Sequence, residues 1–412
     1  MTPAGQLASI IELVEQINKN PQKPADAVIQ SYFRNRRYIG SSDRRTIGDS
    51  AYGVLRHYTG LKNALEVSSE RLVVFAYYLL EKNIPLDALE QMVGHGYGPS
   101  PLSDSELLFL KQLRSYNQFA MEKWLEDTIS DQELIKSLHE QAPFDIRVNT
   151  LKNTRDVVLK SLIAEEFNAS PTPLSPVGIR FGKRKPLDMH KFWQDGTLEV
   201  QDEASQIVGL LCAAKPGMQV LDYCAGAGGK SLSIAADMQN KGTLILSDIY
   251  SHRLQRAKER LRRAGITNYQ IKDINQDHTW FKRQYNRFDL VMVDAPCTGT
   301  GTLRRNPDLK NRLNPTDLEE LCELQRKILG QAQKFVKIGG RLVYATCSVL
   351  QAENSQQSEW FLNTFQGFIP VSIEDAWQHA IGEACPFNGT FAQFLPNIHG
   401  TDGFFISIFE KT

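Results

Sequence analysis

The sequence predicts a multidomain protein with an all-helical N-terminal domain, a small α/β module and a larger C-terminal α/β domain with a mostly parallel, seven-stranded sheet. Three observations carry this prediction. Residues 1–140 repeat apolar side chains at helical spacing. Residues 141–205 mix strand-like and helix-like segments around a proline-rich stretch. From 206 to 412, strand and helix patterns alternate, which is typical of a parallel sheet covered on both faces.

The first two regions contain recognisable elements. In the N-terminal domain, helical spacing across 7–14 and 54–61 predicts two helices, and Ser, Ser and Asp at 41–43 supply a helix start. In the module, we expect a strand at 145–149 and a helix at 156–167, followed by a proline-rich stretch and the segment 178–181. The module therefore links the helical domain to the C-terminal domain.

The C-terminal domain has the strongest alternation. We expect its parallel strands at 219–224, 243–248, 269–273, 288–294 and 341–346. We expect helices between or after them at 229–239, 251–264, 316–337 and 352–365. Two further strands, 391–395 and 404–409, are expected to add an antiparallel hairpin at the end.

Composition bounds the class of protein. The chain has 412 residues, of which 42% are hydrophobic and 23% charged, as in soluble globular proteins. The six cysteines show no zinc-site spacing, and no apolar run is long enough to span a membrane. The N-terminus shows no secretion signal pattern. We therefore expect a cytoplasmic monomer with free thiols, without a metal and without a membrane segment.

Charge is balanced overall but uneven along the chain. Lys plus Arg and Asp plus Glu both number 47, yet 253–287 holds ten basic residues against three acidic ones. Shorter basic clusters lie at 34–45 and 183–185. A solvated helix face explains any one cluster, but several together favour an anionic partner such as RNA.

A glycine-rich turn follows the first C-terminal strand, at 225–231. Such a turn before a helix brings backbone N–H groups close to a ligand. The dinucleotide pattern GxGxxG fails because its third glycine is Ser231, and the P-loop pattern fails because its first glycine is Cys224. A nucleotide hydrolase stays open as an alternative, because Gly229, Lys230 and Ser231 match the end of a P-loop.

Two acids end the next two strands. Asp248 is suited to ribose hydroxyls, and Asp273 to the amino group of an adenine. An Asp at a strand end is often only a helix cap, but two successive ones beside a glycine turn favour a ligand. The best-fitting ligand is an adenosine without phosphates, and S-adenosylmethionine is the obvious candidate.

Two cysteines, Cys297 and Cys347, each lie just past a predicted strand. Methyl transfer to C5 of a cytosine needs a thiolate that adds at C6, an acid that binds the ring at N3, and a group that assists elimination. Cys347, Asp294 and Cys297 can supply these groups at neighbouring strand ends. The alternative is that both cysteines are small buried residues, as most free cysteines are.

The same segments resemble the Sun/Nop family of RNA cytosine-C5 methyltransferases, of the RsmB/Sun type. The similar segments are 201–206, 222–231, 294–301, 304–308, 344–354 and 400–405. The likeness covers roughly 145–412, and two cysteine motifs in the correct order make it specific. It implies a Rossmann-like class I methyltransferase domain that uses S-adenosylmethionine to make 5-methylcytosine in RNA.

The resemblance also implies roles for single residues. Cys347 would be the nucleophile, Cys297 would help release the product, and Asp294 and Lys230 would lie near the target base. The cofactor would be lined by Cys224, Ala225, Gly226, Ala227, Gly228, Gly229, Lys230, Asp248, Asp273 and Asp294. One departure is visible, because the family's turn usually carries Pro where this chain has Ala227.

Residues 1–140 more loosely resemble the NusB-type RNA-binding domain of the ribosomal RNA members. This region holds 15 basic and 18 acidic residues, so RNA contact would depend on a local cluster. The residues expected to contact RNA are Arg34, Arg36, Arg37, Arg44 and Arg45, with Arg147, Asn149, Lys152, Arg304 and Arg305. We expect 16S ribosomal RNA as substrate. The alternatives are a transfer RNA cytosine, a P-loop-like NTPase and a non-catalytic RNA-binding factor.

Overall fold

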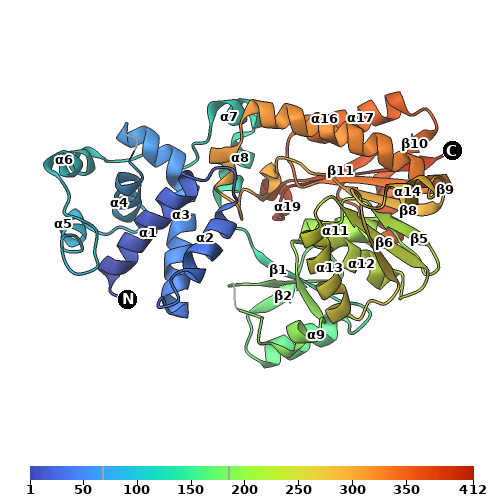
Figure 1. Ribbon diagram of the computed structural model, residues 1–412, viewed down its shortest axis with the longest axis horizontal. Helices are drawn as coiled ribbons and strands as arrows, with labels where there is room; N and C mark the ends of the chain where they lie inside the picture. The colour runs from blue at the N-terminus through green and yellow to red at the C-terminus, as the bar shows by residue number, and fades with distance from the viewer. Residues whose placement is uncertain (67–68, 184–185) are drawn as a thin grey trace. The chain divides into compact units, whose positions relative to one another are not determined.

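The structure, a computed structural model, describes residues 1–66, 69–183 and 186–412. These residues form two compact units (Figure 1). The helical unit comprises Met1–Glu140 and Thr302–Asn314, and the α/β unit comprises Gln141–Gly301 and Pro315–Thr412. Arg184 and Lys185, from the basic cluster at 183–185, lie outside the described residues. Among the described residues, none of the helices is both long and apolar enough to cross a bilayer.

The helical unit buries the apolar faces that the sequence predicts. Its helices are α1 (Pro3–Asn18), α2 (Ala25–Arg34), α3 (Ser41–Leu65), α4 (Glu70–Leu80), α5 (Leu86–Glu90), α6 (Asp104–Gln112), α7 (Lys123–Ile129), α8 (Gln132–His139) and the short α15 (Leu309–Arg312). Leu7 and Ile10 of α1 meet Val54 and Leu55 of α3 in one core. The likeness of this unit to NusB-type domains stays a prediction.

Residues 302–314 belong to the helical unit, although the sequence analysis assigned them to the C-terminal domain. The reason is a set of hydrogen bonds to side chains and backbone far away in the sequence. The Lys310 Nζ atom donates to the Arg56 carbonyl at 2.5 Å and lies 2.8 Å from His139 Nε2. The Ala25 N–H donates to the Asp308 carboxylate at 3.1 Å. Burial lowers the pKa of Lys310 to about 7.

The α/β unit begins with the small module, an antiparallel sheet in the order β2-β3-β1-β4. Its strands are β1 (Phe144–Val148), β2 (Ala169–Pro171), β3 (Gly178–Phe181) and β4 (Leu198–Val200), with helices α9 (Arg155–Ala164) and α10 (Lys191–Gln194). A separate apolar cluster, which includes Ile146 and Leu162, fills the space between the sheet and α9.

The larger sheet of this unit is mixed and has eight strands, in the order β10-β12-β9-β8-β5-β6-β7, with β11 paired to β12. The strands are β5 (Gln219–Asp222), β6 (Thr243–Asp248), β7 (Tyr269–Asp273), β8 (Phe288–Asp294), β9 (Val336–Thr346), β10 (Phe368–Pro370), β11 (Phe391–Phe394) and β12 (Phe404–Lys411). The predicted count of seven is therefore wrong. The additional strand is β10, whose three residues are too few to show a strand period in the sequence.

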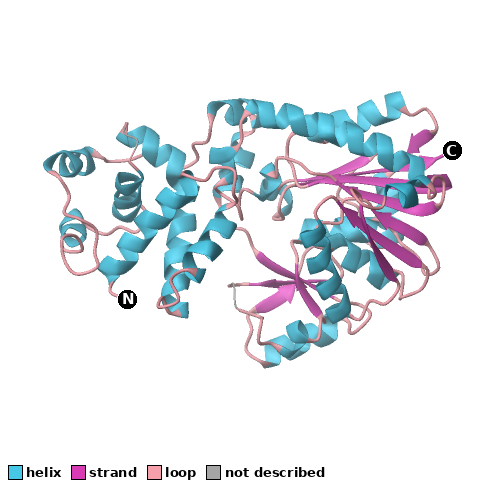
Figure 2. Ribbon diagram, viewed as in Figure 1, coloured by secondary structure: helices cyan, strands magenta, loops and turns pink. Residues whose placement is uncertain are grey.

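The five strands β5 to β9 pair in parallel, and β12 runs antiparallel to β9, β10 and β11. Successive residues face opposite sides: Val220 joins one apolar cluster and Leu221 another. Because fully burying such a side chain contributes about 1.5–3 kcal/mol, both faces need cover. Helices lie on both sides of the sheet in Figure 2.

The remaining helices supply this cover. They are α11 (Glu203–Leu211), α12 (Gly229–Asp237), α13 (Ser251–Ala264), α14 (His278–Lys282), α16 (Pro315–Ala332), α17 (Ser355–Thr364), α18 (Ile373–Ala380) and α19 (Pro396–His399), with 3-10 turns η1 (Thr300–Thr302), η2 (Gln333–Phe335) and η3 (Gln351–Glu353). Leu232 of α12 and Leu254 of α13 pack on one face, and Leu329 of α16 and Phe361 of α17 pack on the other.

Candidate active site

The two cysteines singled out by the sequence meet at the carboxyl edge of the sheet. β8 and β9 are neighbouring parallel strands, and Asp294 at the end of β8 pairs in register with Ala345 of β9. Each chain segment then turns into a loop that carries one thiol. The Sγ atoms of Cys297 and Cys347 are 3.4 Å apart, and both side chains are half-buried.

A buried carboxylate holds the Cys297 loop. Glu353 is fully buried, and its carboxylate accepts hydrogen bonds from the Thr298 N–H at 2.8 Å and the Thr298 hydroxyl at 2.5 Å. The Gln325 amide donates to the same carboxylate at 3.0 Å and to the Pro296 carbonyl at 3.0 Å. The sequence analysis gave these residues no role. Glu353 lies in the Cys347 motif, but nothing local points to a partner in the Cys297 loop.

The glycine at 301 is required by a close approach of two backbones. The Gly301 N–H donates to the Cys347 carbonyl at 3.0 Å, and the Gly403 N–H donates to the Gly301 carbonyl at 2.8 Å. A Cβ atom on Gly301 would lie 2.0 Å from the Gly403 oxygen. Glycine therefore lets the loop after Cys297, the loop after β9 and the start of β12 meet at one point.

A buried ion pair lies beside the thiols. The Lys230 Nζ atom is 2.6 Å from the Asp294 Oδ2 atom, and the side chains are 8% and 33% exposed. Burial alone would lower the pKa of Lys230, but the charge of Asp294 and its hydrogen bond outweigh burial, so the pKa is raised. Lys230 also interacts electrostatically with Cys347 and lies 5.0 Å from the Phe404 ring centre.

Two thiols near this edge of the sheet, Cys297 and Cys224, have raised pKa values. The hydrogen bond with Cys347, followed by burial, raises the pKa of Cys297 well above that of a free thiol. Cys297 therefore carries its proton at neutral pH as long as Cys347 is its partner. Burial likewise raises the pKa of Cys224, at the start of the glycine turn.

The glycine turn joins β5 to α12. Gly226 and Gly228 have φ angles of 53° and 78°, in the left-handed region that favours glycine. A Cβ atom on Gly226 would meet nothing within 4 Å, so the turn faces open space there. The Ala225 N–H donates to the Ser247 carbonyl at 2.8 Å, which ties the turn to β6.

The two predicted ribose and adenine acids lie side by side. Asp248 and Asp273 are register partners on β6 and β7. The Asp248 carboxylate accepts from the Gly226 N–H at 2.9 Å and the Tyr250 N–H at 2.8 Å. The Ser251 hydroxyl donates to Asp273, and this bond lowers the pKa of that carboxyl group. Ile249, which directly follows Asp248 in the chain, is 48% exposed and offers an apolar surface.

The residues present fit an adenosine-type cofactor. A left-handed glycine turn, two neighbouring strand-end carboxylates and the Lys230–Asp294 pair share one edge of the sheet. In open α/β sheets, ligands bind in the crevice outside the carboxyl ends of the strands. All predicted cofactor and catalytic residues belong to this edge, while their individual roles stay predictions.

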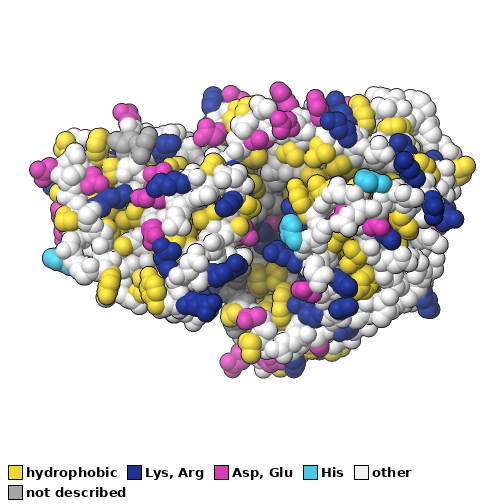
Figure 3. Space-filling view, in the orientation of Figure 1, with side chains coloured by type: hydrophobic (Ala, Val, Ile, Leu, Met, Phe, Trp, Pro, Cys, Tyr) yellow, Lys and Arg dark blue, Asp and Glu magenta, His cyan; other side chains and the backbone are white. Residues whose placement is uncertain are grey.

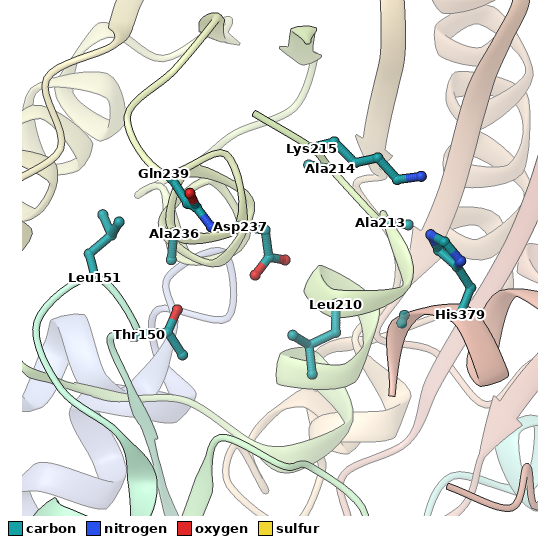
Figure 4. Close-up of a pocket in the computed structure, with 11 residues that line it drawn as sticks. Thr150, Leu151, Leu210, Ala213, Ala214, Lys215, Ala236, Asp237, Gln239 and His379 are labelled. Carbon is teal, nitrogen blue, oxygen red and sulfur yellow. The ribbon is translucent and has the colours of Figure 1, made fainter. Parts of the chain in front are cut away.

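A cavity of about 590 Å³ lies elsewhere (Figure 4). It is lined by Thr150, Leu210, Lys215, Asp237 and His379, among others. Lys215 lies just before β5 and Asp237 lies before β6, so this part of the lining is at the amino edge of the sheet, and His379 is contributed by α18. Burial raises the pKa of Asp237 to about 7. This cavity is distinct from the cysteine site.

Several residues expected to contact RNA are used inside the fold instead. Arg147 is 2% exposed and donates to Gln201 at 2.7 Å, and Asn149 is 3% exposed and donates to the carbonyls of Gly196 and Ala264. Arg304 is also buried. The expectation for these three residues is wrong, because periodicity alone does not show which polar side chains point inward.

Other basic residues do reach the surface. In the helical unit, Arg34, Arg37 and Arg45 are exposed, and Tyr38, which follows Arg37 in the chain, is 76% exposed. Arg36 pairs with Glu12. In the α/β unit, basic side chains gather over α13 on the face in Figure 3. The exposed ones on this helix are Arg253, Arg256 and Arg262.

Two parts of the chain match described protein families. Residues 210–410 match the family described as 16S rRNA methyltransferase RsmB/F. Residues 120–188 match the RsmF/B-like ferredoxin-like domain of methyltransferases.

Curated relatives have consistent names. The chain is 35% identical over 269 residues to the probable ribosomal RNA small subunit methyltransferase B of Bacillus subtilis, covering 65% of this chain and 59% of that protein. It is 32% identical over 314 residues to the probable protein of the same name from Synechocystis sp., covering 75% of this chain and 69% of that protein. The chain thus spans about three fifths of the length of the Bacillus relative.

Solved structures share the fold. The crystal structure of PH0851 aligns with a TM-score of 0.75 at 24% identity, over 100% of this chain and 99% of that chain. A methyltransferase homologue protein from Pyrococcus horikoshii aligns with a TM-score of 0.60 at 25% identity, over 76% of this chain and 100% of that chain. The first of these likenesses concerns the fold alone.

Proposed function

Since the chain belongs to the RsmB/F family of 16S rRNA methyltransferases, with S-adenosylmethionine as methyl donor, we propose that it methylates carbon 5 of a cytosine in 16S ribosomal RNA. Its α/β unit has the class I methyltransferase fold with a mixed sheet. One observation carries the proposal. Two thiols 3.4 Å apart adjoin a buried Lys–Asp pair at the edge of the sheet that holds the glycine turn.

Cys347 is the proposed nucleophile. Its thiolate adds to C6 of the cytosine, the C5–C6 double bond opens, and C5 becomes nucleophilic. The Lys230 ammonium interacts with Cys347, and this interaction is attractive when the sulfur is a thiolate. When bound, S-adenosylmethionine supplies the electrophilic methyl group that C5 attacks.

Asp294 and Lys230 are proposed to hold the base. Negative charge that leaves the sulfur spreads toward N3 of the ring, so N3 needs a proton during the addition. Asp294, whose carboxylate is one-third exposed, is assigned to bind N3. Lys230 keeps that carboxylate oriented at 2.6 Å and balances its charge. During the addition a proton passes from the Lys230 ammonium through the Asp294 carboxyl group to N3, and it returns by the same route when the ring regains its double bond.

Cys297 is proposed to assist elimination. The largest cause of its raised pKa is the hydrogen bond with Cys347. That cause disappears once the Cys347 sulfur is bonded to C6, so Cys297 releases its own proton to water more easily at the stage that needs a base. Its thiolate then takes the C5 proton, the C5–C6 bond re-forms, and the Cys347 thiolate leaves. Glu353 keeps the Cys297 loop in place through Thr298.

The test is a set of cysteine variants of the full chain. Cys347→Ala should lower methyl incorporation into 16S ribosomal RNA by at least about 10⁴-fold, because no other group replaces the nucleophile. Cys297→Ala should accumulate a covalent protein–RNA species on denaturing gels. Cys385→Ala, a half-buried cysteine outside the site, is the matched control and should do neither. Full activity of Cys347→Ala would contradict the proposal.

The substrate RNA is tested separately. Mapping 5-methylcytosine in RNA from cells with and without the protein should show one or more 16S ribosomal positions that depend on it. A dependent position in transfer RNA instead would move the assignment to the alternative substrate. We further propose that the helical unit binds RNA through Arg34, Arg37, Arg45 and Tyr38, since exposed basic side chains and an exposed aromatic within one short stretch of chain suit single-stranded RNA. The cytoplasmic location and monomeric state stay predictions from the sequence.

A further inference from the structure

We propose that Arg260 is a positioning residue for the cofactor turn and that Glu199 of the small module holds Arg260 in place. This inference rests on the proposed function only for the identity of the ligand. Arg260 is in α13 and bridges two distant segments. Its Nη1 atom donates to the Ala227 carbonyl at 2.6 Å, and its Nη2 atom donates to the Glu199 carboxylate at 3.0 Å.

The turn needs such support because of its composition. Ala227 lies between two glycines in the left-handed region, and its own φ is not left-handed. Glycines lose more conformational freedom on ordering than other residues, so a turn of this kind is ordered by its backbone contacts. The N–H groups of Ala225 and Gly226 are bound by β6 residues, and Arg260 binds the carbonyl of Ala227.

Glu199 is built to fix Arg260. Its side chain is 3% exposed, and it also pairs with Arg263, whose guanidinium lies 4.3 Å from the Trp193 ring centre. A buried carboxylate with two guanidinium partners has few alternative positions, and charge-assisted bonds of this kind are stronger than neutral ones. The Arg260 guanidinium is therefore held at both Nη atoms, by the Ala227 carbonyl and by Glu199.

A second contact from the module reaches the same turn. The Gln201 amide lies 3.5 Å from the Gly229 carbonyl, and Arg147 donates to the Gln201 side-chain oxygen at 2.7 Å. The small module thus contacts the turn directly through Gln201, at Gly229, and indirectly through Glu199, which holds the arginine that binds Ala227. These contacts set the shape of the cofactor turn.

The experiment compares two arginines of α13 in the full chain. Arg260→Gln should raise the Kd for S-adenosylmethionine, measured by calorimetry without RNA, by about tenfold, since a charge-assisted hydrogen bond is lost. It should raise KM for the cofactor and leave kcat at saturation within about twofold. Glu199→Gln should produce a smaller rise in Kd. Arg262→Gln makes the same charge change at an exposed position and should leave Kd unchanged.

Two further readouts separate positioning from general damage. Amide hydrogen exchange at 225–229 should be faster in ligand-free Arg260→Gln than in the parent protein, and this readout does not depend on the cofactor. Adding Ala227→Pro, which restricts the backbone without the arginine, should recover most of the lost affinity. Unchanged exchange and unchanged Kd in Arg260→Gln, or an equal loss in Arg262→Gln, would overturn the inference. A parent protein that does not bind S-adenosylmethionine would instead reject the proposed function.

Discussion

Each of the two units buries a lysine, and the two lysines respond in opposite ways. Lys230 in the α/β unit is 7% exposed, and Lys310 in the helical unit is 2% exposed. The pKa of Lys230 is raised, whereas burial lowers that of Lys310 to about 7. The difference is the partner: Asp294 lies 2.6 Å from Lys230, while the described contacts of Lys310 are carbonyl oxygens and His139.

This comparison shows that burial alone does not decide whether a lysine is charged. Desolvation acts against both ammonium groups, and a carboxylate within hydrogen-bond distance reverses its effect. In the α/β unit, the pair keeps a cation next to the thiols. In the helical unit, Lys310 ties residues 302–314 to α3 and α8, and among the described residues its hydrogen-bond partners include no carboxylate. A buried lysine therefore forms an ion pair in one unit and hydrogen bonds to backbone carbonyls in the other.

The largest expected effect comes from removing the carboxylate of the α/β unit. Asp294→Asn should lower kcat/KM by about 10²-fold, the scale of one positioned acid–base group. It should also lower the free energy of unfolding by about 3 kcal/mol, because a buried ammonium loses its partner. Methyl incorporation and urea unfolding measure the two effects.

A matched control for this change lies on the same strand. Asp289 of β8 pairs with Lys337, whose side chain is 45% exposed. Asp289→Asn should change the free energy of unfolding by less than about 1 kcal/mol, as exposed pairs do. If both variants behave alike, the electrostatic account of Lys230 is wrong.

An intermediate effect is expected from the exposed arginines of the helical unit. Replacing Arg34, Arg37 and Arg45 together by Gln should weaken RNA binding about tenfold. It should also reduce the slope of log Kd against the logarithm of the salt concentration by about two to three. Affinity for S-adenosylmethionine should not change. Filter binding at several salt concentrations measures this.

The control set replaces three exposed lysines of the same unit, Lys23, Lys62 and Lys82, by Gln. This set changes the net charge equally, so it should weaken RNA binding less than the arginine set. Equal losses from both sets would indicate a diffuse charge effect and would remove the case for a local RNA surface.

A third effect is a pH dependence of the stability of the helical unit. Unfolded lysine has a pKa of about 10.4, above the folded value of about 7 for Lys310. The folded state therefore binds fewer protons between these values, and the unfolding free energy should rise as pH increases from 7 to 10. The groups facing Lys310 are Arg56, His139 and the Ala120 carbonyl.

Lys310→Met removes this titration. The melting temperature of the helical unit in the parent protein should rise by about 5–9 °C between pH 7 and pH 9, and the variant should show a flatter profile. Parallel profiles would show that other groups cause the pH dependence, and the contrast between the two lysines would then lose its thermodynamic support.

The sequence determined the order of the elements and the edge of the sheet at which the predicted site residues lie. The observed α13 has the predicted bounds 251–264, and Asp248 and Asp273 end β6 and β7 as predicted. This worked because parallel strands place their carboxyl ends at one edge, so residues after each strand come together without knowledge of packing. Three of the segments that resemble the methyltransferase family, 222–231, 294–301 and 344–354, lie at the carboxyl ends of β5, β8 and β9.

Tertiary structure alone decided which partners these residues have. Glu353 binds Thr298 across 55 positions, Lys310 binds Arg56 across 254, and Arg260 reaches Ala227 across 33. Arg147, which was expected to contact RNA, is buried. Periodicity encodes which face of an element is apolar, but a polar side chain finds its partner only when distant segments pack, and the free energy of that contact depends on a local solvent exposure that no single segment contains.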